Sequence, residues 1–102
     1  MTIEEVYQLL QSTDYPVAYN AFRDDVDPPF LTYNVAFTSN FGADNHVHKI
    51  VNHINITLWT AKKDLTAEAK VEAALSDLYW NKEETFLDEE EIYEIVYEVE
   101  II

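Results

Sequence analysis

The sequence predicts an α+β domain in which two helices pack on one face of a mainly antiparallel sheet, in the order α-β-β-β-α-β-β. Two segments repeat apolar residues at helical spacing, and other segments alternate apolar and polar side chains as half-buried strands do. The chain has 102 residues, of which 48% are hydrophobic and 14% aromatic. This size and composition predict one folded domain over residues 1–102 rather than a disordered chain.

Residues 2–12 are predicted to form the first helix. The apolar positions at helical spacing are Ile3, Val6, Tyr7 and Leu10. Thr2 followed by Glu5 fits a capping box, in which each side chain bonds an amide of the first turn. Pro16 disfavours helix at the residue before it, so a short edge strand is expected over residues 17–22. Residues 23–29 follow as a loop.

The next two strands are predicted to pair through a projecting loop. Residues 30–38 alternate, and one face holds Leu31, Tyr33, Val35 and Phe37. Residues 39–45 contain Gly42, the only glycine, and are expected to form the loop. The return strand spans residues 47–60 and is long enough that we expect a bulge or bend near Lys49. One of its faces holds Ile50, Ile54, Ile56 and Leu58, and the other holds Val51, His53, Asn55, Thr57 and Trp59.

The second half predicts a helix and two strands. The helix is expected over residues 65–80, capped by Asp64 or Thr66. Its apolar stripe consists of Ala67, Val71, Ala74, Leu75 and Leu78. Residues 85–88 are predicted as a short strand, 89–90 as a turn and 91–102 as the final strand. Helical spacing also fits part of the last segment, but its β-branched and aromatic residues favour a strand. In that strand Tyr93, Ile95, Tyr97, Val99 and Ile101 would share one face, with Glu94, Glu98 and Glu100 on the other.

The chain is strongly acidic, with 20 Asp and Glu against six Lys and Arg and a net charge of −14. Such a surface repels nucleic acid and phospholipid, so direct binding of either is not expected. Two interpretations stay open, a simply solvated surface and one that repels or imitates DNA. The acidic surface candidates are Asp24, Asp25, Asp27, Glu89, Glu90, Glu94, Glu98 and Glu100.

Signals for catalysis, cofactors and membranes are missing from the sequence. There is no cysteine, one glycine and no nucleophile motif, so we expect no enzyme and no cofactor. No apolar run approaches the roughly 20 residues that span a bilayer. The sequence starts directly with a helix pattern, so we expect no signal peptide and a soluble intracellular product.

A metal site is considered and not predicted. His46 and His48 would share one strand face near Asp44, a spacing that could hold a divalent metal with one more ligand. His53 has the opposite parity, and no second ligand motif supports the site. Solvated or interface histidines are the preferred interpretation.

Several aromatic residues fall at positions that the domain's own core does not obviously cover. Phe41 lies in the expected loop, Trp59 on the polar face of its strand, and Trp80 at the end of the second helix. Each either fills a side pocket or contacts another subunit. The subunit-interface candidates are Asn40, Phe41, Asp44, His46, His48, Trp59 and Trp80.

Five short runs, spread over nearly the whole chain, carry a resemblance to a known family. They are Tyr15-Pro16-Val17-Ala18-Tyr19, Pro28-Pro29-Phe30-Leu31-Thr32-Tyr33, Asn40-Phe41-Gly42-Ala43-Asp44-Asn45, Asn55-Ile56-Thr57-Leu58-Trp59-Thr60-Ala61-Lys62-Lys63-Asp64 and Ile92-Tyr93-Glu94-Ile95-Val96-Tyr97-Glu98-Val99. In this order the runs resemble small tail proteins of siphophages and prophages of Gram-positive bacteria. Among these, the chain is similar to the tail terminator, or tail completion, proteins.

The resemblance implies a virion protein of the phage neck. Such a protein would form a ring, expected to be a hexamer, that caps the tail tube, meets the major tail tube protein and joins the head-tail connector or stopper. DNA would pass through the ring without sequence-specific binding, and assembly would occur in the host cytoplasm. Two alternatives stay open, another head-tail connector or stopper protein and an acidic DNA mimic that inhibits a host nuclease.

Overall fold

The computed structural model describes the backbone of residues 1–43 and 46–102, and every side chain there except those of residues 41, 43, 47 and 48. Two helices and five strands occur in the predicted order within these residues, so the α+β fold is confirmed. The elements are α1 (Ile3–Gln11), β1 (Val17–Tyr19), β2 (Phe30–Ala43), β3 (His46–Thr60), α2 (Leu65–Ala74), β4 (Trp80–Leu87) and β5 (Ile92–Ile101).

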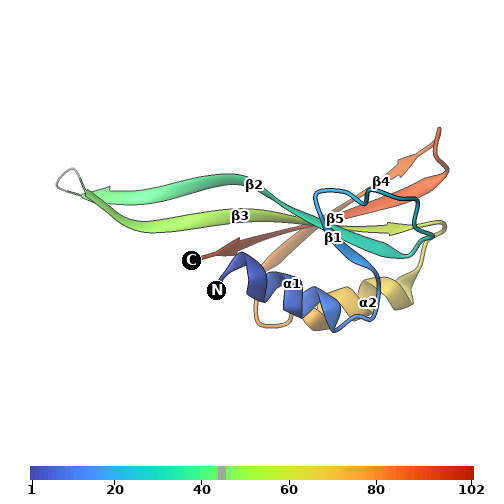
Figure 1. Cartoon of the computed structure of the whole chain (residues 1–102), viewed down its shortest axis with the longest axis horizontal. Coiled ribbons are helices and arrows are strands. Elements are labelled where there is room, and N and C mark those ends of the chain that lie inside the picture. Colours follow the sequence, from blue (N-terminus) through green and yellow to red (C-terminus); the bar gives the residue numbers. More distant parts are fainter. Residues whose placement is uncertain (44–45) are drawn as a thin grey trace.

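The strands form one mixed sheet in the spatial order β1-β2-β3-β5-β4. The short edge strand β1 runs parallel to β2, and every other neighbouring pair is antiparallel. Figure 1 shows α1 and α2 side by side on the same face of this sheet. The opposite face, which we call the outer face, carries the alternate side chain of each strand.

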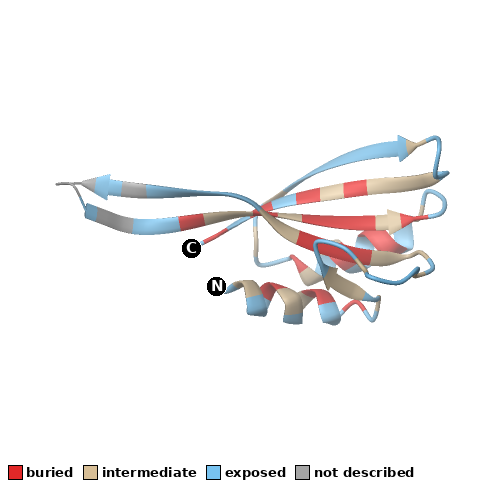
Figure 2. Ribbon diagram, turned by 45° about the horizontal axis from the view of Figure 1, so that its top comes forward, coloured by how far each residue is buried: buried red, intermediate tan, exposed pale blue. Residues whose placement is uncertain are grey.

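The core lies between the two helices and the middle of the sheet, in the half of the molecule where most of the red segments lie in Figure 2. Val6 and Leu10 of α1 and Val71 of α2 face the sheet and are fully buried. The sheet contributes the buried side chains Leu31, Tyr33, Ile54, Ile56, Leu58, Ile95, Tyr97, Val99 and Ile101. The alternation expected in β5 is therefore confirmed, because Ile95, Tyr97, Val99 and Ile101 all face the core.

The helix starts follow the sequence prediction. The amide of Glu5 donates to Thr2 Oγ1 at 3.1 Å, and the amide of Thr2 donates to Glu5 Oε1 at 3.1 Å, which completes the capping box of α1. Asp64 caps α2, since its Oδ1 accepts a hydrogen bond from the amide of Ala67 at 3.0 Å.

Several predicted boundaries were wrong. The second helix ends at Ala74 rather than at residue 80, and residues 80–87, not 85–88, form β4. Pairing of β4 with β5 along its full length outweighs the helical spacing of Leu78. The first strand ends at Tyr19 rather than at residue 22. Residues 39–43, predicted as loop, continue β2 because they pair with β3.

Two irregularities interrupt the β2–β3 ladder. The register moves from Val35–Ile54 to Phe37–His53, so Ala36 is an extra residue, and Phe37 shares the outer face with His53. The prediction that Phe37 shares a face with Leu31 was therefore wrong. A second shift, between Phe41 and Gly42, falls beside Lys49 and confirms the expected bulge. A Cβ on Gly42 would lie 3.0 Å from the carbonyl oxygen of His46, which explains a glycine at this end of the hairpin.

Candidate interaction surface

The β2–β3 hairpin extends well past the rest of the domain. Strand β1 pairs with β2 only over Leu31–Tyr33, and β5 pairs with β3 only over Asn52–Thr60. We call residues 36–43 and 46–51 the distal hairpin. As far as the described residues show, it is a two-stranded ribbon with both outer edges unpaired. Figures 1 and 2 show it projecting from the domain, mostly exposed, and the molecule measures 50 × 27 × 25 Å.

Each face of the distal hairpin presents a large apolar side chain to solvent. Phe37 is 59% exposed on the outer face, and Ile50, of opposite parity to the outer-face residue His53 along β3, is 56% exposed. A short two-stranded ribbon is marginally stable alone, and open edges with exposed apolar groups favour contact with another chain. Ile50 was predicted to share a face with Ile54 and Ile56, but unlike these two residues it is not buried.

Polar cross-strand contacts hold the base of the distal hairpin. The rings of Phe37 and His53 stack with centroids 3.9 Å apart. His53 Nε2 lies 3.0 Å from Ser39 Oγ, and its Nδ1 lies 3.5 Å from Glu100 Oε1. Thr38 Oγ1 also donates to Asn52 Oδ1 at 2.8 Å. These contacts order the ribbon where it leaves the core and keep His53 inside a local network.

The outer face holds a second feature at the opposite end of the molecule. The rings of Phe30 and Trp59 stack with centroids 6.0 Å apart, and Phe22 meets Phe30 edge-on at 5.4 Å. Trp59 Nε1 donates to Thr32 Oγ1 at 3.0 Å. With Leu87 and Ile92 they line a cavity of about 450 Å³, which we call the aromatic pocket. Its rim includes Asp24, Asp25 and Glu90.

The acidic candidates separate into two places. Asp24, Asp25 and Asp27 lie in the loop after β1, and Glu89 and Glu90 lie in the β4–β5 turn. Figure 1 shows this loop and this turn at the end away from the distal hairpin. The remaining candidates, Glu94, Glu98 and Glu100, lie on the outer face of β5, where Glu98 and Glu100 are exposed and Glu94 is half-buried.

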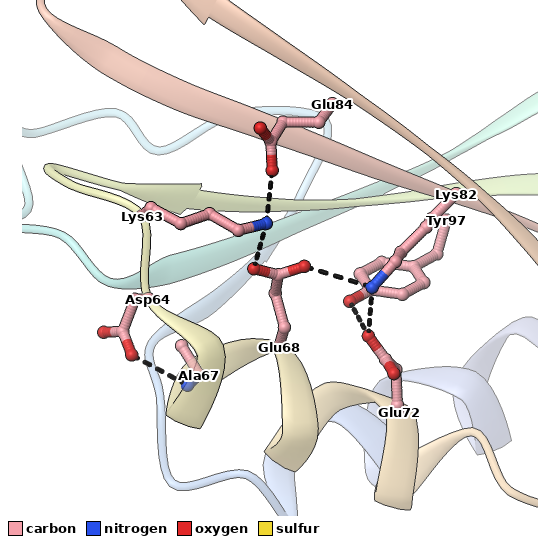
Figure 3. A network of polar contacts seen from close by, with 8 residues as sticks. All are labelled: Lys63, Asp64, Ala67, Glu68, Glu72, Lys82, Glu84 and Tyr97. Atoms are coloured by element: carbon pink, nitrogen blue, oxygen red, sulfur yellow. Dashed lines mark hydrogen bonds and ion pairs between the residues drawn. The ribbon is translucent and has the colours of Figure 1, made fainter.

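A third group of charges lies on the helix-covered face and was missed by the sequence prediction (Figure 3). Glu68 of α2 is only 2% exposed. Lys63 Nζ lies 2.7 Å from its Oε2, and Lys82 Nζ lies 3.1 Å from its Oε1. Lys82 also pairs with Glu72 at 2.8 Å, Lys63 with Glu84, and the Tyr97 hydroxyl donates to Glu72 Oε2 at 2.7 Å. Residues Lys63, Glu68, Glu72, Lys82, Glu84 and Tyr97 form what we call the ion network.

The protonation states of the ion network follow from its contacts. Burial alone would raise the pKa of Glu68, but hydrogen bonds and charge from Lys63 and Lys82 outweigh burial and hold that pKa below its ordinary value. Hydrogen bonds to Glu68 and Glu84 raise the pKa of Lys63. Burial, reinforced by the bond to Glu72, raises the pKa of Tyr97. Near neutral pH Glu68 and Lys63 are therefore charged and Tyr97 is a neutral phenol. The contacts of the network tie α2 to β4 and β5.

The predicted interface residues fall into three groups. Asn40 and His46 lie exposed on the distal hairpin. The side chains of Phe41, Asp44 and His48 lie outside the described residues. Trp59 and Trp80 are half-buried in their own domain, Trp59 in the aromatic pocket and Trp80 edge-on to Tyr97 at 5.4 Å. Phe22, Phe30 and Phe37 were not predicted as surface features, because strand spacing alone does not reveal a bulge or a loop that folds over the sheet.

Two kinds of feature are absent from the described part of the chain. No three His, Cys, Asp or Glu side chains there are grouped so as to hold a metal ion. None of the helices there has the length and apolar character needed to cross a bilayer. In comparisons with known proteins, no protein-family model and no curated protein matches the sequence.

Proposed function

We propose that the protein is a structural component of the phage neck that forms a ring, caps the tail tube and joins it to the head connector. In this proposal the protein binds copies of itself, the major tail tube protein and the connector or stopper, and carries out no catalysis. The proposal takes its family from the resemblance of the five sequence runs. One structural observation, the distal hairpin, supports a role in assembly.

The distal hairpin supports the proposal because it is built for contact rather than for its own stability. Its edges have unpaired backbone groups, and Phe37 and Ile50 are more than half exposed on opposite faces. In a ring of identical subunits each contact joins two different patches, so one copy must offer a protruding element and the next must receive it. A projecting ribbon suits the first part of such a contact.

The charge distribution supports the passage of DNA. Glu98 and Glu100 are exposed on the outer face of β5, while the helices cover the other face of the sheet. We propose that the outer face of β5 lines the bore of the ring. A carboxylate-lined bore repels phosphate, so that DNA moves through without adhering.

Deletion of the gene from the phage or prophage that carries it tests the function. We expect overlong tails or tails that fail to join heads in negative-stain electron microscopy, with normal particles restored by the wild-type gene. Normal necks after deletion would contradict the proposal. Salt-dependent inhibition of a purified nuclease by the protein would instead support the DNA-mimic alternative.

Phe37→Ala tests the part played by the distal hairpin. Because Phe37 lies outside the core, the free energy of unfolding of the monomer should fall by no more than about 1 kcal/mol. The yield of rings, measured by native mass spectrometry or on purified necks, should fall strongly. Tyr97→Ala is the contrasting variant, since loss of a fully buried aromatic residue should destabilise the monomer itself by about 3–5 kcal/mol. An unchanged ring yield for Phe37→Ala would remove the distal hairpin from the contact.

A further inference from the structure

We propose that the aromatic pocket of one copy receives the distal hairpin of a second copy, with Ile50 entering the pocket and Lys49 meeting its acidic rim. The inference rests on the proposed function in taking a ring as its setting, and it adds the receiving half of the subunit contact.

The pocket has the features of a receptor for an apolar side chain. Phe22, Phe30 and Trp59 form one wall through mutual ring contacts at 5.4 and 6.0 Å. Leu87 and Ile92, from the β4–β5 end of the sheet, form another. The indole NH of Trp59 is already bonded to Thr32. The cavity therefore offers mainly apolar surface, and filling it with an aliphatic group removes that surface from water.

The rim selects the charge of the occupant. Asp24 and Asp25 from the loop after β1 and Glu90 from the β4–β5 turn are all exposed at the cavity. An apolar segment with a positive neighbour would be favoured there, and an acidic one would be repelled. The chain has 20 Asp and Glu against six Lys and Arg, so the rim disfavours its many acidic segments.

The distal hairpin is the segment of this chain that matches. Of the six Lys and Arg residues, only Lys49 lies on it, and Lys49 is exposed. Its neighbour Ile50 is 56% exposed although it is a large aliphatic residue. Lys63 and Lys82 are held in the ion network, and Lys70 lies over the Tyr15 ring at 5.1 Å. Lys49 and Ile50 are consecutive in β3 and point to opposite faces of the ribbon. We therefore place the ribbon edge-on in the pocket, with Ile50 against the apolar wall and Lys49 against the acidic rim.

The positions of hairpin and pocket fix the geometry of the contact. They lie at opposite ends of a molecule that is 50 Å long (Figure 1), so one copy cannot satisfy its own pocket without refolding. The contact therefore joins two copies, and a head-to-tail arrangement, which the ring of the proposed function requires, closes when the rotation per subunit allows it.

Disulfide trapping between copies tests this arrangement. No native thiol can interfere, because the chain contains no cysteine. Ile50→Cys and Ala21→Cys, an exposed residue lining the pocket, are prepared as two separate single variants and mixed under oxidising conditions. We expect the mixed disulfide dimer to exceed either homodimer by about tenfold, because only that pair brings the two sulfur atoms within bonding distance. Intact mass spectrometry distinguishes the three species.

Two controls keep the result specific. In the first control, Leu65→Cys is used in place of Ile50→Cys. Leu65 is an exposed leucine near Lys62 at the start of α2, and the mixed dimer should disappear. Adding Asp24→Lys and Asp25→Lys to the pocket variant should reduce the mixed dimer at least about tenfold, since like charges then face each other. Thermal unfolding of each variant verifies that it is folded.

The outcomes separate this inference from the proposed function. A mixed dimer no more abundant than the homodimers, both in the free protein and with tail tubes present, overturns the docking. If deletion of the gene still leaves tails without heads, the neck function stands with another contact. A dominant mixed dimer together with normal necks after deletion would keep the docking and reject the function. Preferential trapping through Leu65→Cys would assign the pocket to the start of α2 instead.

Discussion

Strand β3 passes through two regions that surround the same residue types differently. In the domain body, Ile54, Ile56 and Leu58 are buried beneath the helices, whereas Ile50, on the distal hairpin, is more than half exposed. The body is held by burial of apolar surface, and the hairpin by a two-stranded ladder and a few polar contacts. The difference teaches that the exposed hairpin side chains Phe37 and Ile50 are available for contact because they are not packed in the core.

The strongest test of this comparison uses one substitution at two positions of the same strand. Ile56→Ala should lower the free energy of unfolding by about 2–5 kcal/mol, because it leaves a cavity in the core. Ile50→Ala makes the same chemical change on the distal hairpin and should cost less than about 1 kcal/mol. Urea unfolding followed by tryptophan fluorescence measures both, and equal losses would show that the hairpin is part of the core.

The ion network allows the same kind of comparison between a buried, paired charge and an exposed one. Glu68→Gln removes a buried charge that two lysines contact, and should lower the free energy of unfolding by about 1–3 kcal/mol. The lysine side chains remain partly exposed and can be solvated, which limits the loss. Glu83→Gln, on the outer face of β4, is the matched control and should change stability by no more than about 0.5 kcal/mol. A control with the same loss would mean that net charge, not the network, is responsible.

The contribution of Glu68 should also depend on pH in a known direction. Its pKa is lower in the folded protein than in the unfolded chain, where the pKa of a glutamate is about 4.3. Its stabilisation is therefore fully present above that ordinary pKa and is lost as the pH falls through the lowered folded value. The difference in unfolding free energy between wild type and Glu68→Gln should be constant near neutral pH and shrink in acid. A difference that grows in acid would contradict the assignment.

The smallest effect is expected at Ala36, where the two regions meet. Deleting Ala36 removes the extra residue of the bulge while Val35 and Phe37 keep their faces, so the stability should change by no more than about 1 kcal/mol. Deleting Asn55, which is paired on both sides, would move every following side chain to the wrong face and should prevent folding. Circular dichroism and thermal unfolding distinguish the two deletions. Equal damage would show that the bulge itself is required.

The sequence predicted those parts of the fold whose signals are local. The capping box of Thr2 and Glu5 needs only neighbouring residues, and the alternation of β5 reflects burial on one face of a sheet. Both were confirmed. The face of Phe37 was not predictable, because apolar alternation runs unbroken from Leu31 to Phe37 and gives no sign that Ala36 is unpaired.

The remaining errors have tertiary causes. Strand β4 lacks alternation because Lys82 and Glu84, on its covered face, meet charges of α2 and Lys63 instead of apolar groups. Glu68 itself could have been suspected, since it lies three and seven residues before the buried Val71 and Leu75 on one helix stripe. The aromatic pocket needed the loop after β1 to fold onto the sheet, which no local pattern encodes.

The continuity of β3 has a mechanical consequence. A force applied at the tip of the ribbon, along its length, runs parallel to the strand axis and perpendicular to the interstrand hydrogen bonds. Because β2 and β3 meet at that end, the load pulls both strands in one direction and stretches the bonds of β3 to β5, and of β2 to β1, together in shear. The molecule should therefore resist pulling through this strand far better than peeling of β4 from the sheet edge.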